Sequence, residues 1–226
     1  MDQNPFNFTS DDLMLNPEPR CPSVLLLDVS GSMAGTPIDE LAAGLALYRD
    51  ELAADSMASK RVEVAVVTFG GEVQVAQPFA NADRFTPLTL RATGDTPMGQ
   101  AIVRALDLLE VRKNEIRQGG VGLFRPWVFL ITDGGPTDVQ SPYWSQAKER
   151  VRQGEERGSF SFFSVGIKGA NLDRLKELSA RPPLSLDGLR FRDLFNWLSA
   201  SQKMVSQSKP GDKLALPPVN WNSIDV

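Results

Sequence analysis

The chain has 226 residues, of which 42% are hydrophobic and 23% are charged, and its formal net charge is −4. The apolar and charged fractions are ordinary for a folded domain, and the length predicts one domain of about 150–200 residues with flanking segments. A negative net charge without a long run of like charge argues against nucleic-acid binding through a basic face.

Cysteine and histidine usage narrows the chemistry further. Cys21 is the only cysteine, which excludes an internal disulfide and favours a reducing compartment. The sequence has no histidine, so the usual zinc ligand and the usual general base near neutral pH are both missing. No stretch approaches the ~20 apolar residues of a transmembrane helix, and the start lacks a signal-peptide pattern. We therefore expect a cytoplasmic protein that does not contact a membrane.

Predicted strands and helices alternate along the chain. In order, the patterns predict a strand at 24–27, a helix at 37–52, strands at 61–69 and 72–79, a helix at 97–117, a strand at 127–131, a helix at 142–157, a strand at 160–165, and helices at 171–179 and 191–205. Gly70-Gly71 predicts a hairpin, and hence one antiparallel edge strand. The remaining buried-type strands predict an α/β fold with a mainly parallel central sheet and helices on both faces.

The domain boundaries follow from composition. We expect an extended lead-in over residues 1–20, one folded domain over 21–206 and a proline-containing tail over 207–226. Two of the long predicted helices begin at the proline of a Thr-Pro pair. This pattern predicts Thr36 and Thr96 as N-caps, with proline at the first helical position. A threonine can act as a cap and as a metal ligand at once, so this prediction leaves other roles open.

Polar residues gather where predicted strands end. Asp28-Val29-Ser30-Gly31-Ser32 follows the first strand, and Thr132-Asp133-Gly134 follows the strand at 127–131. Gly94-Asp95-Thr96-Pro97 precedes a long helix. Loops at the carboxyl ends of parallel strands converge on one crevice, so we expect these segments to meet. A carboxylate at the rim of a dry sheet must be solvated, paired or coordinated.

These oxygen groups suit a hard divalent cation. Mg²⁺ prefers six oxygen ligands, and Mn²⁺ or Ca²⁺ are the alternatives that we consider. Ser30, Ser32 and Thr96 supply neutral hydroxyls, and Asp28 and Asp133 supply charge either directly or through coordinated water. So many neutral ligands leave the cation electrophilic, so that it favours a carboxylate from another molecule.

Three other interpretations of these clusters compete with a cation site. Capping of the loops alone would explain each cluster separately, but it explains their joint occurrence poorly. A metal-dependent phosphohydrolase or phosphotransferase could use Asp28 as nucleophile, yet Ser30 stands where such enzymes place a second acid, and no P-loop signature is present. A structural subunit with a degenerate site is the third.

The glycine-rich segment Gly119-Gly120-Val121-Gly122 follows a predicted helix and is interpreted as a linker, because phosphate-binding loops follow strands.

A family resemblance joins the clusters. The segments VLLLDVSGSM, GDTPMG and VFLITDGGPTD together resemble the von Willebrand factor A (VWA) domain and its metal-ion-dependent adhesion site (MIDAS), over about residues 21–206. This resemblance implies a Rossmann-like three-layer α/β sandwich. It also implies Ser30, Ser32 and Thr96 as direct ligands of the metal, and Asp28 and Asp133 as largely water-mediated ones. A partner's acidic residue would complete the coordination.

A narrower resemblance suggests a biological setting. The segments SGSMAGTPIDEL and TDGGPTD and the ending FNWLSASQKMVSQSKPG are similar to bacterial TerY/YegL-like VWA proteins, which are associated with tellurium resistance. This implies a non-enzymatic adaptor in a stress-response or phospho-signalling system, with a protein kinase or phosphatase as a candidate partner. Asp95 departs from the glycine often found at its position, and its carboxylate could aid cation capture or compete with the partner. The candidate rim residues of the partner-binding face are Gly31, Met33, Asp95, Gly134 and Asp138.

Overall fold

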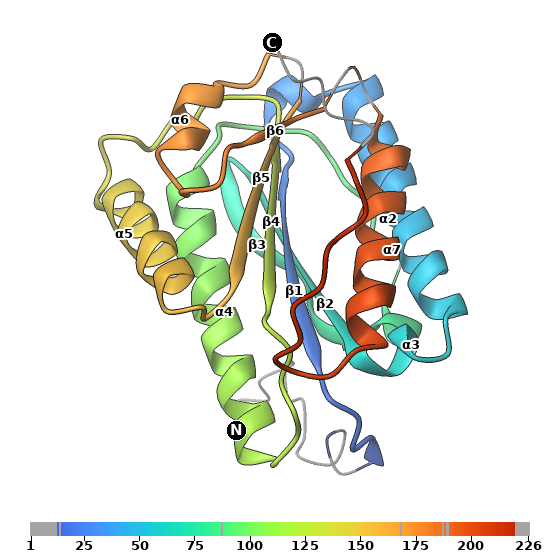
Figure 1. Cartoon of the computed structure of the whole chain (residues 1–226). Coiled ribbons are helices and arrows are strands. Elements are labelled where there is room, and N and C mark those ends of the chain that lie inside the picture. The colour runs from blue at the N-terminus through green and yellow to red at the C-terminus, as the bar shows by residue number, and fades with distance from the viewer. Residues whose placement is uncertain are drawn as a thin grey trace, which may run out of the picture.

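A six-stranded sheet in the order β3-β2-β1-β4-β5-β6 forms the centre of the computed structural model (Figure 1). The structure describes residues 13, 15–86, 88–167, 169–186, 188 and 190–219. The strands are β1 (Cys21–Asp28), β2 (Val62–Gly70), β3 (Glu72–Asn81), β4 (Trp127–Thr132), β5 (Ser161–Gly166) and β6 (Leu184–Ser185). β2 and β3 pair antiparallel, and the other neighbours pair parallel. The predicted α/β class, with one antiparallel edge strand, is confirmed.

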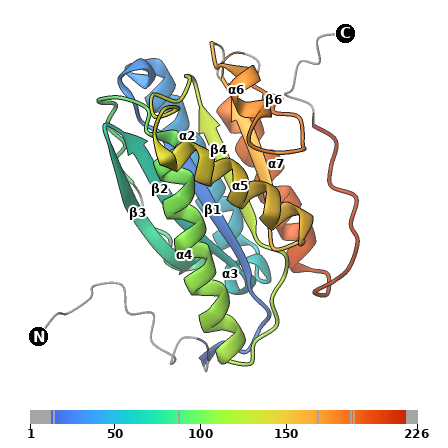
Figure 2. The same ribbon diagram turned by 90° about the vertical axis from the view of Figure 1, so that its left-hand side faces the viewer.

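Helices cover both faces of this sheet (Figures 1 and 2). α2 (Thr36–Ala54) and α7 (Phe191–Ser206) lie on one face, with the short α3 (Ala58–Arg61) at their base. α4 (Met98–Gln118), α5 (Pro142–Glu156) and α6 (Leu172–Lys176) lie on the other. Two short 3-10 turns, η1 (Gly31–Met33) and η2 (Ala82–Arg84), complete the elements.

The central strand β1 is buried on both sides, which explains its continuous apolar run. Leu25 and Leu27 pack into the core on the α2 and α7 side, whereas Val24 and Leu26 pack into the core on the α4 and α5 side. Alternate residues of a strand point to opposite faces, so a strand covered on both faces needs apolar residues at every position. Asp28 ends this run, and the loop that follows carries the candidate site.

The predicted cap at Thr36 was wrong, and one short strand was missed. α2 begins at Thr36 itself, and its N-cap is Gly35 with φ +83°, so the Thr36 side chain forms no cap. β6 was not predicted, because its two residues lie just after Pro182-Pro183 and pair only with Val165 and Gly166 at the end of β5. The hairpin at Gly70-Gly71 is confirmed, with Gly71 at φ +72° in the turn between β2 and β3.

A buried network of ion pairs lies at the amino end of the sheet. Glu63 of β2 accepts hydrogen bonds from Arg20 at 3.0 Å and from Arg112 of α4 at 2.6 Å and 2.8 Å, and all three side chains are at most 4% exposed. This network ties the entry into β1 to α4. Within the residues that the structure describes, no helix is both long and apolar enough to span a membrane.

Candidate metal site

Asp28 organises the loop that follows β1. Its side chain is fully buried, and Oδ1 accepts a hydrogen bond from the backbone N–H of Ser30 at 2.8 Å. The hydroxyl of Thr132, at the end of β4, donates to Oδ2. The pKa of Asp28 is raised, mainly because the carboxyl group is buried. The hydrogen bonds from Ser30 and Thr132 act in the opposite direction, and the nearby Asp133 carboxylate adds to the rise. No role for Thr132 was predicted from the sequence, but its hydroxyl links the loops that follow β1 and β4.

Ser30, Ser32 and Asp133 form a continuous chain of hydrogen bonds. The two serine hydroxyls lie 3.1 Å apart, and Ser32 Oγ donates to Asp133 Oδ1 at 2.8 Å. Ser30 is 2% exposed, while Ser32 is open to solvent. Residues 101 positions apart in the sequence therefore meet at the carboxyl ends of β1 and β4.

Thr96 approaches this chain from the loop before α4. A Cβ built on Gly134 would lie 3.8 Å from Thr96 Oγ1 and 4.0 Å from Ser32 Oγ, so both hydroxyls lie close to Gly134. Thr96 is 6% exposed and is held through its backbone: its N–H donates to Thr137 Oγ1 at 3.2 Å, and its C=O accepts from the Thr137 N–H at 3.0 Å. The five predicted metal ligands thus gather at one end of the sheet.

Backbone contacts between glycine-containing loops fix the position of the Thr96 loop. Thr93 N–H donates to Val29 C=O at 2.8 Å, and Gly31 N–H donates to Gly94 C=O at 2.9 Å. Gly94 has φ +69°, and a Cβ there would lie 2.5 Å from Gly71 Cα. Only glycine combines this conformation with such a close backbone approach, so Gly94 sets the distance between the loop and the hairpin.

The candidate rim residues have different environments. Gly31 and Asp95 are exposed, and Gly134 is partly exposed beside the hydroxyls. Met33, in contrast, is fully buried in the core on the α2 side, so its side chain lies beneath the site and does not reach the rim. The Asp95 carbonyl accepts a hydrogen bond from the Gly71 N–H at 2.8 Å. The side chain of Asp95, the residue before Thr96, is exposed.

The predicted cap at Thr96 was also wrong, and its place is taken by another rim candidate, Asp138. The N-cap of α4 is Pro97, with no capping bond from its own side chain. The Asp138 carboxylate instead accepts hydrogen bonds from Gly99 N–H at 3.1 Å and Gln100 N–H at 2.9 Å. Asp138 therefore supplies the oxygen acceptor that the first turn of α4 needs.

The family comparison agrees with this geometry. The model of the von Willebrand factor type A domain matches residues 24–193, a span that contains all five candidate ligands. This chain belongs to the VWA family. No curated protein sequence matches it significantly.

Several solved structures share the fold at low sequence identity. Proximal thread matrix protein 1 from the mussel byssus, with a zinc-occupied MIDAS motif, is 17% identical with a TM-score of 0.54, over 82% of this chain and 48% of that one. Manganese-loaded TRAP protein of Plasmodium vivax is 21% identical with a TM-score of 0.54, over 73% and 64%. The pilus adhesin SpaC of Lactobacillus rhamnosus GG is 13% identical with a TM-score of 0.66, over 83% and 31%. The chain thus spans about a third to two thirds of these proteins.

The donor set of this VWA domain fits a hard cation. Its oxygen groups comprise three hydroxyls and two carboxylates, which are the ligand types that Mg²⁺, Mn²⁺ and Ca²⁺ favour. Among the residues described, no group of three or more His, Cys, Asp or Glu side chains could hold a metal ion. Asp28 is buried close to Asp133, and a cation between two carboxylates would offset their mutual repulsion.

Proposed function

We propose that this VWA domain is a metal-ion-dependent protein-interaction module. Ser30, Ser32 and Thr96 would hold Mg²⁺, or alternatively Mn²⁺ or Ca²⁺, while Asp28 and Asp133 contribute directly or through water. The observation that carries the proposal is the hydrogen-bonded chain from Ser30 through Ser32 to Asp133, with the Thr96 and Ser32 hydroxyls both close to Gly134.

The site has a buried base and one side that is open to solvent. Asp28 is buried and orients Ser30 and Thr132, so the base of the site is fixed before any partner arrives. Ser32 is exposed, which leaves one side of the site open to another molecule. A bound cation supplies positive charge at this open side, and an aspartate or glutamate of the partner supplies the complementary negative charge.

A binding role is favoured over the phosphohydrolase alternative. A carboxylate nucleophile must reach its substrate, whereas Asp28 is fully buried and both of its oxygens accept hydrogen bonds. We therefore infer that the protein is not an enzyme. Turnover of a generic phosphoester that disappears in Asp28→Asn would contradict this inference.

The proposed setting is a bacterial TerY/YegL-like adaptor in the cytoplasm. It rests on the similarity of SGSMAGTPIDEL and TDGGPTD to that group. In this setting the partner is a protein of a stress-response or phospho-signalling system, such as a kinase or phosphatase, that offers an acidic residue to the cation. A role in tellurium resistance belongs to the same proposal.

The first test measures cation binding by thermal unfolding with and without Mn²⁺ or Mg²⁺. Thr96→Ala removes a proposed ligand, and Thr93→Ala is the matched control, because Thr93 is an exposed threonine of the same loop. A cation at 100 times its Kd stabilises a protein by about 2.7 kcal/mol, or about 5–10 °C in Tm for a chain of this size. We expect this rise in the wild type and Thr93→Ala only. An equal rise in all three proteins would refute the assigned ligand.

The second test concerns the partner. Immobilised wild type, Thr96→Ala and Thr93→Ala are incubated with lysate of the native host in Mg²⁺ or in EDTA. We expect a protein that is retained in Mg²⁺ by the wild type and Thr93→Ala and is lost in EDTA or with Thr96→Ala. Retention of the same proteins under every condition would mean that the metal site does not govern binding.

A further inference from the structure

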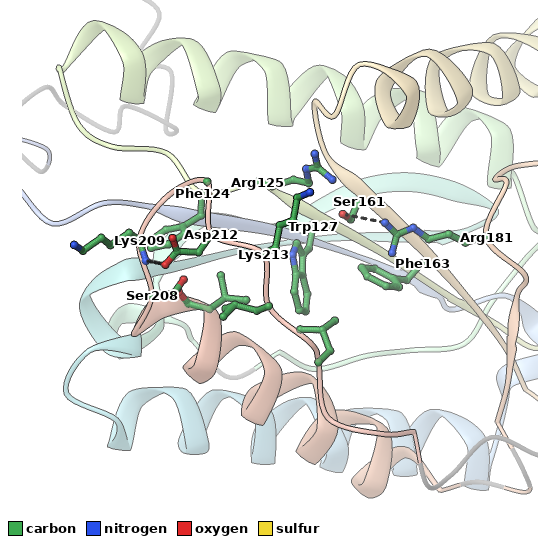
Figure 3. A pocket seen from close by; sticks show the side chains of 14 residues that line it. Phe124, Arg125, Trp127, Ser161, Phe163, Arg181, Ser208, Lys209, Asp212 and Lys213 are labelled. Carbon is green, nitrogen blue, oxygen red and sulfur yellow. Dashed lines mark hydrogen bonds between the residues drawn. The ribbon is translucent and has the colours of Figure 1, made fainter.

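A second site lies at the opposite end of the sheet from the candidate metal site. A pocket of about 410 Å³ opens between the first residues of β4 and β5 and the chain segment after α7 (Figure 3). Trp127 begins β4 and Ser161 begins β5, so the pocket is at the amino ends of the strands, whereas the candidate metal site is at their carboxyl ends. We call it the amino-end pocket. Its volume is in the range of ligand-binding clefts.

The amino-end pocket concentrates positive charge in an acidic protein. Arg125, Arg181, Lys209 and Lys213 line it, and Asp212 is the only acid among the lining residues. The whole chain carries a net charge of −4, so this local excess of cations runs against the overall balance. In Figure 3 the cations are spread along the pocket, with Lys209 toward one end, Arg125 and Lys213 in the middle and Arg181 toward the other end.

Three of these cations have no carboxylate partner among the described residues. Arg125, Lys209 and Lys213 are exposed, and no ion pair joins them to an acid in that part of the chain. Arg181 is held in place: its Nε lies 3.2 Å from Glu155 Oε1, and its guanidinium lies over the Phe163 ring at 4.9 Å. The pocket therefore offers one oriented cation and three that are free to pair with an incoming anion.

Apolar groups lie between the cations. Trp127 is 5% exposed and forms part of the floor together with the partly exposed ring of Phe163. Leu214 is 40% exposed at the wall formed by the segment after α7. Basic side chains beside an apolar floor match a ligand that carries both acidic and apolar groups.

The wall after α7 is anchored at both ends. Near its start, Arg61 donates hydrogen bonds to the carbonyls of Ser206 at 2.6 Å and Ser208 at 3.4 Å. Farther along, Trp197 Nε1 donates to the carbonyl of Pro217 at 2.8 Å, and Leu216 packs against the core. Because the wall is built into the fold, binding in the pocket need not order a loose tail.

We propose that the amino-end pocket docks an extended acidic segment of a partner protein, independently of the metal site. Carboxylates spaced along the segment pair with Lys209, with Arg125 and Lys213, and with Arg181, and an apolar side chain between them contacts Trp127 and Leu214. The spread of the cations along the pocket favours an extended chain over one compact anion. The domain would then carry two docking sites at opposite ends of its sheet.

The test uses a defined probe in EDTA, so that the metal site cannot contribute. The probe is a fluorescein-labelled peptide in which glutamates alternate with leucine and phenylalanine, and its binding is followed by fluorescence anisotropy. The pocket variant is Arg125→Glu/Lys213→Glu. The control variant is Arg104→Glu/Arg192→Glu, which changes the net charge equally at exposed positions on α4 and α7.

We expect saturable binding to the wild type and to the control variant, at least tenfold weaker binding to the pocket variant, and weaker binding of the peptide with every glutamate changed to glutamine. Carbodiimide should cross-link the peptide to Lys209 or Lys213. No saturable binding to the wild type, or equal binding to both variants, would overturn the proposal. Binding of ATP or inorganic triphosphate that depends on Arg125 and Lys213, without binding of the peptide, would overturn it in favour of a small anionic ligand.

Discussion

Asp138 offers a sharp test of how the candidate metal site is built. Its carboxylate accepts hydrogen bonds from the N–H groups of Gly99 and Gln100, the first free amides of α4. Thr96, a proposed cation ligand, lies just before this helix. Asp138→Ala removes the acceptor without adding volume, so its effects report the loss of this contact between the β4–α5 loop and α4.

The expected loss follows from two contributions. Removing an N-cap side chain costs about 0.5–2 kcal/mol, and removing a negative charge from a helix N-terminus costs about 0.3–1 kcal/mol. These terms overlap, so we expect Asp138→Ala to reduce the free energy of unfolding by about 1–2 kcal/mol. For a chain of this size that corresponds to a fall in Tm of about 2–8 °C. Asp138→Asn keeps an oxygen acceptor and should lose about half as much.

Thermal and urea unfolding measure these changes, and Asp50→Ala is the matched control. The Asp50 side chain is 63% exposed on α2 and, within the described part of the chain, pairs with its neighbour Arg49 alone, so its removal should cost less than about 0.5 kcal/mol. We also expect the Mn²⁺-dependent rise in Tm to shrink in Asp138→Ala, because the turn after Thr96 loses its support. If Asp138→Ala were no less stable than Asp50→Ala, the capping role would be refuted.

Three further predictions concern stability and reactivity. Burial raises the pKa of Cys21 to about 12, so a disulfide reagent at mildly alkaline pH should label this thiol only as the protein unfolds. The folded state holds the thiol proton more tightly than the unfolded state, so the free energy of unfolding should fall as the pH rises from about 9 toward about 12. Rapid labelling of the folded protein would contradict this prediction. Glu63→Gln leaves Arg20 and Arg112 buried without their shared carboxylate and should cost about 3–5 kcal/mol in urea unfolding, whereas a loss under about 1 kcal/mol would show that the network is dispensable. Gly94→Ala should cost at least about 1–3 kcal/mol and weaken cation binding, since it puts a Cβ at φ +69° against the hairpin backbone, and wild-type Tm and cation affinity in this variant would disprove the argument.

The sheet and the gathering of the oxygen groups could be predicted because both depend on local patterns. Continuous apolar runs require strands that are covered on two faces, and the residues just after such strands converge at one edge of a parallel sheet. Asp28 and Asp133 are therefore predicted to lie in neighbouring loops from the sequence alone. Their roles as ligands remain predictions.

Long-range polar contacts could not be predicted in the same way. The Thr-Pro pairs at the starts of α2 and α4 favoured capping by Thr36 and Thr96, yet α4 is capped by Asp138, which is 39 residues from Gly99 in the sequence. The spacing of residues in the sequence does not identify a capping residue so far along the chain. For the buried network, the available signal was a single charge, Glu63, within an otherwise apolar strand, and only the fold identifies its two arginine partners.

The contacts between the loops around the candidate metal site run largely through main-chain atoms. Thr93 meets Val29, Gly31 meets Gly94, and Gly71 meets the carbonyl of Asp95 in this way. Apart from the glycines, and from Ser32 and Thr137, whose side chains hydrogen-bond within the site, exposed side chains in these loops can therefore be exchanged without disturbing the frame that presents the oxygen groups. Selection, natural or in a display library, can thus retarget the domain by varying its rim while the same cation chemistry is kept.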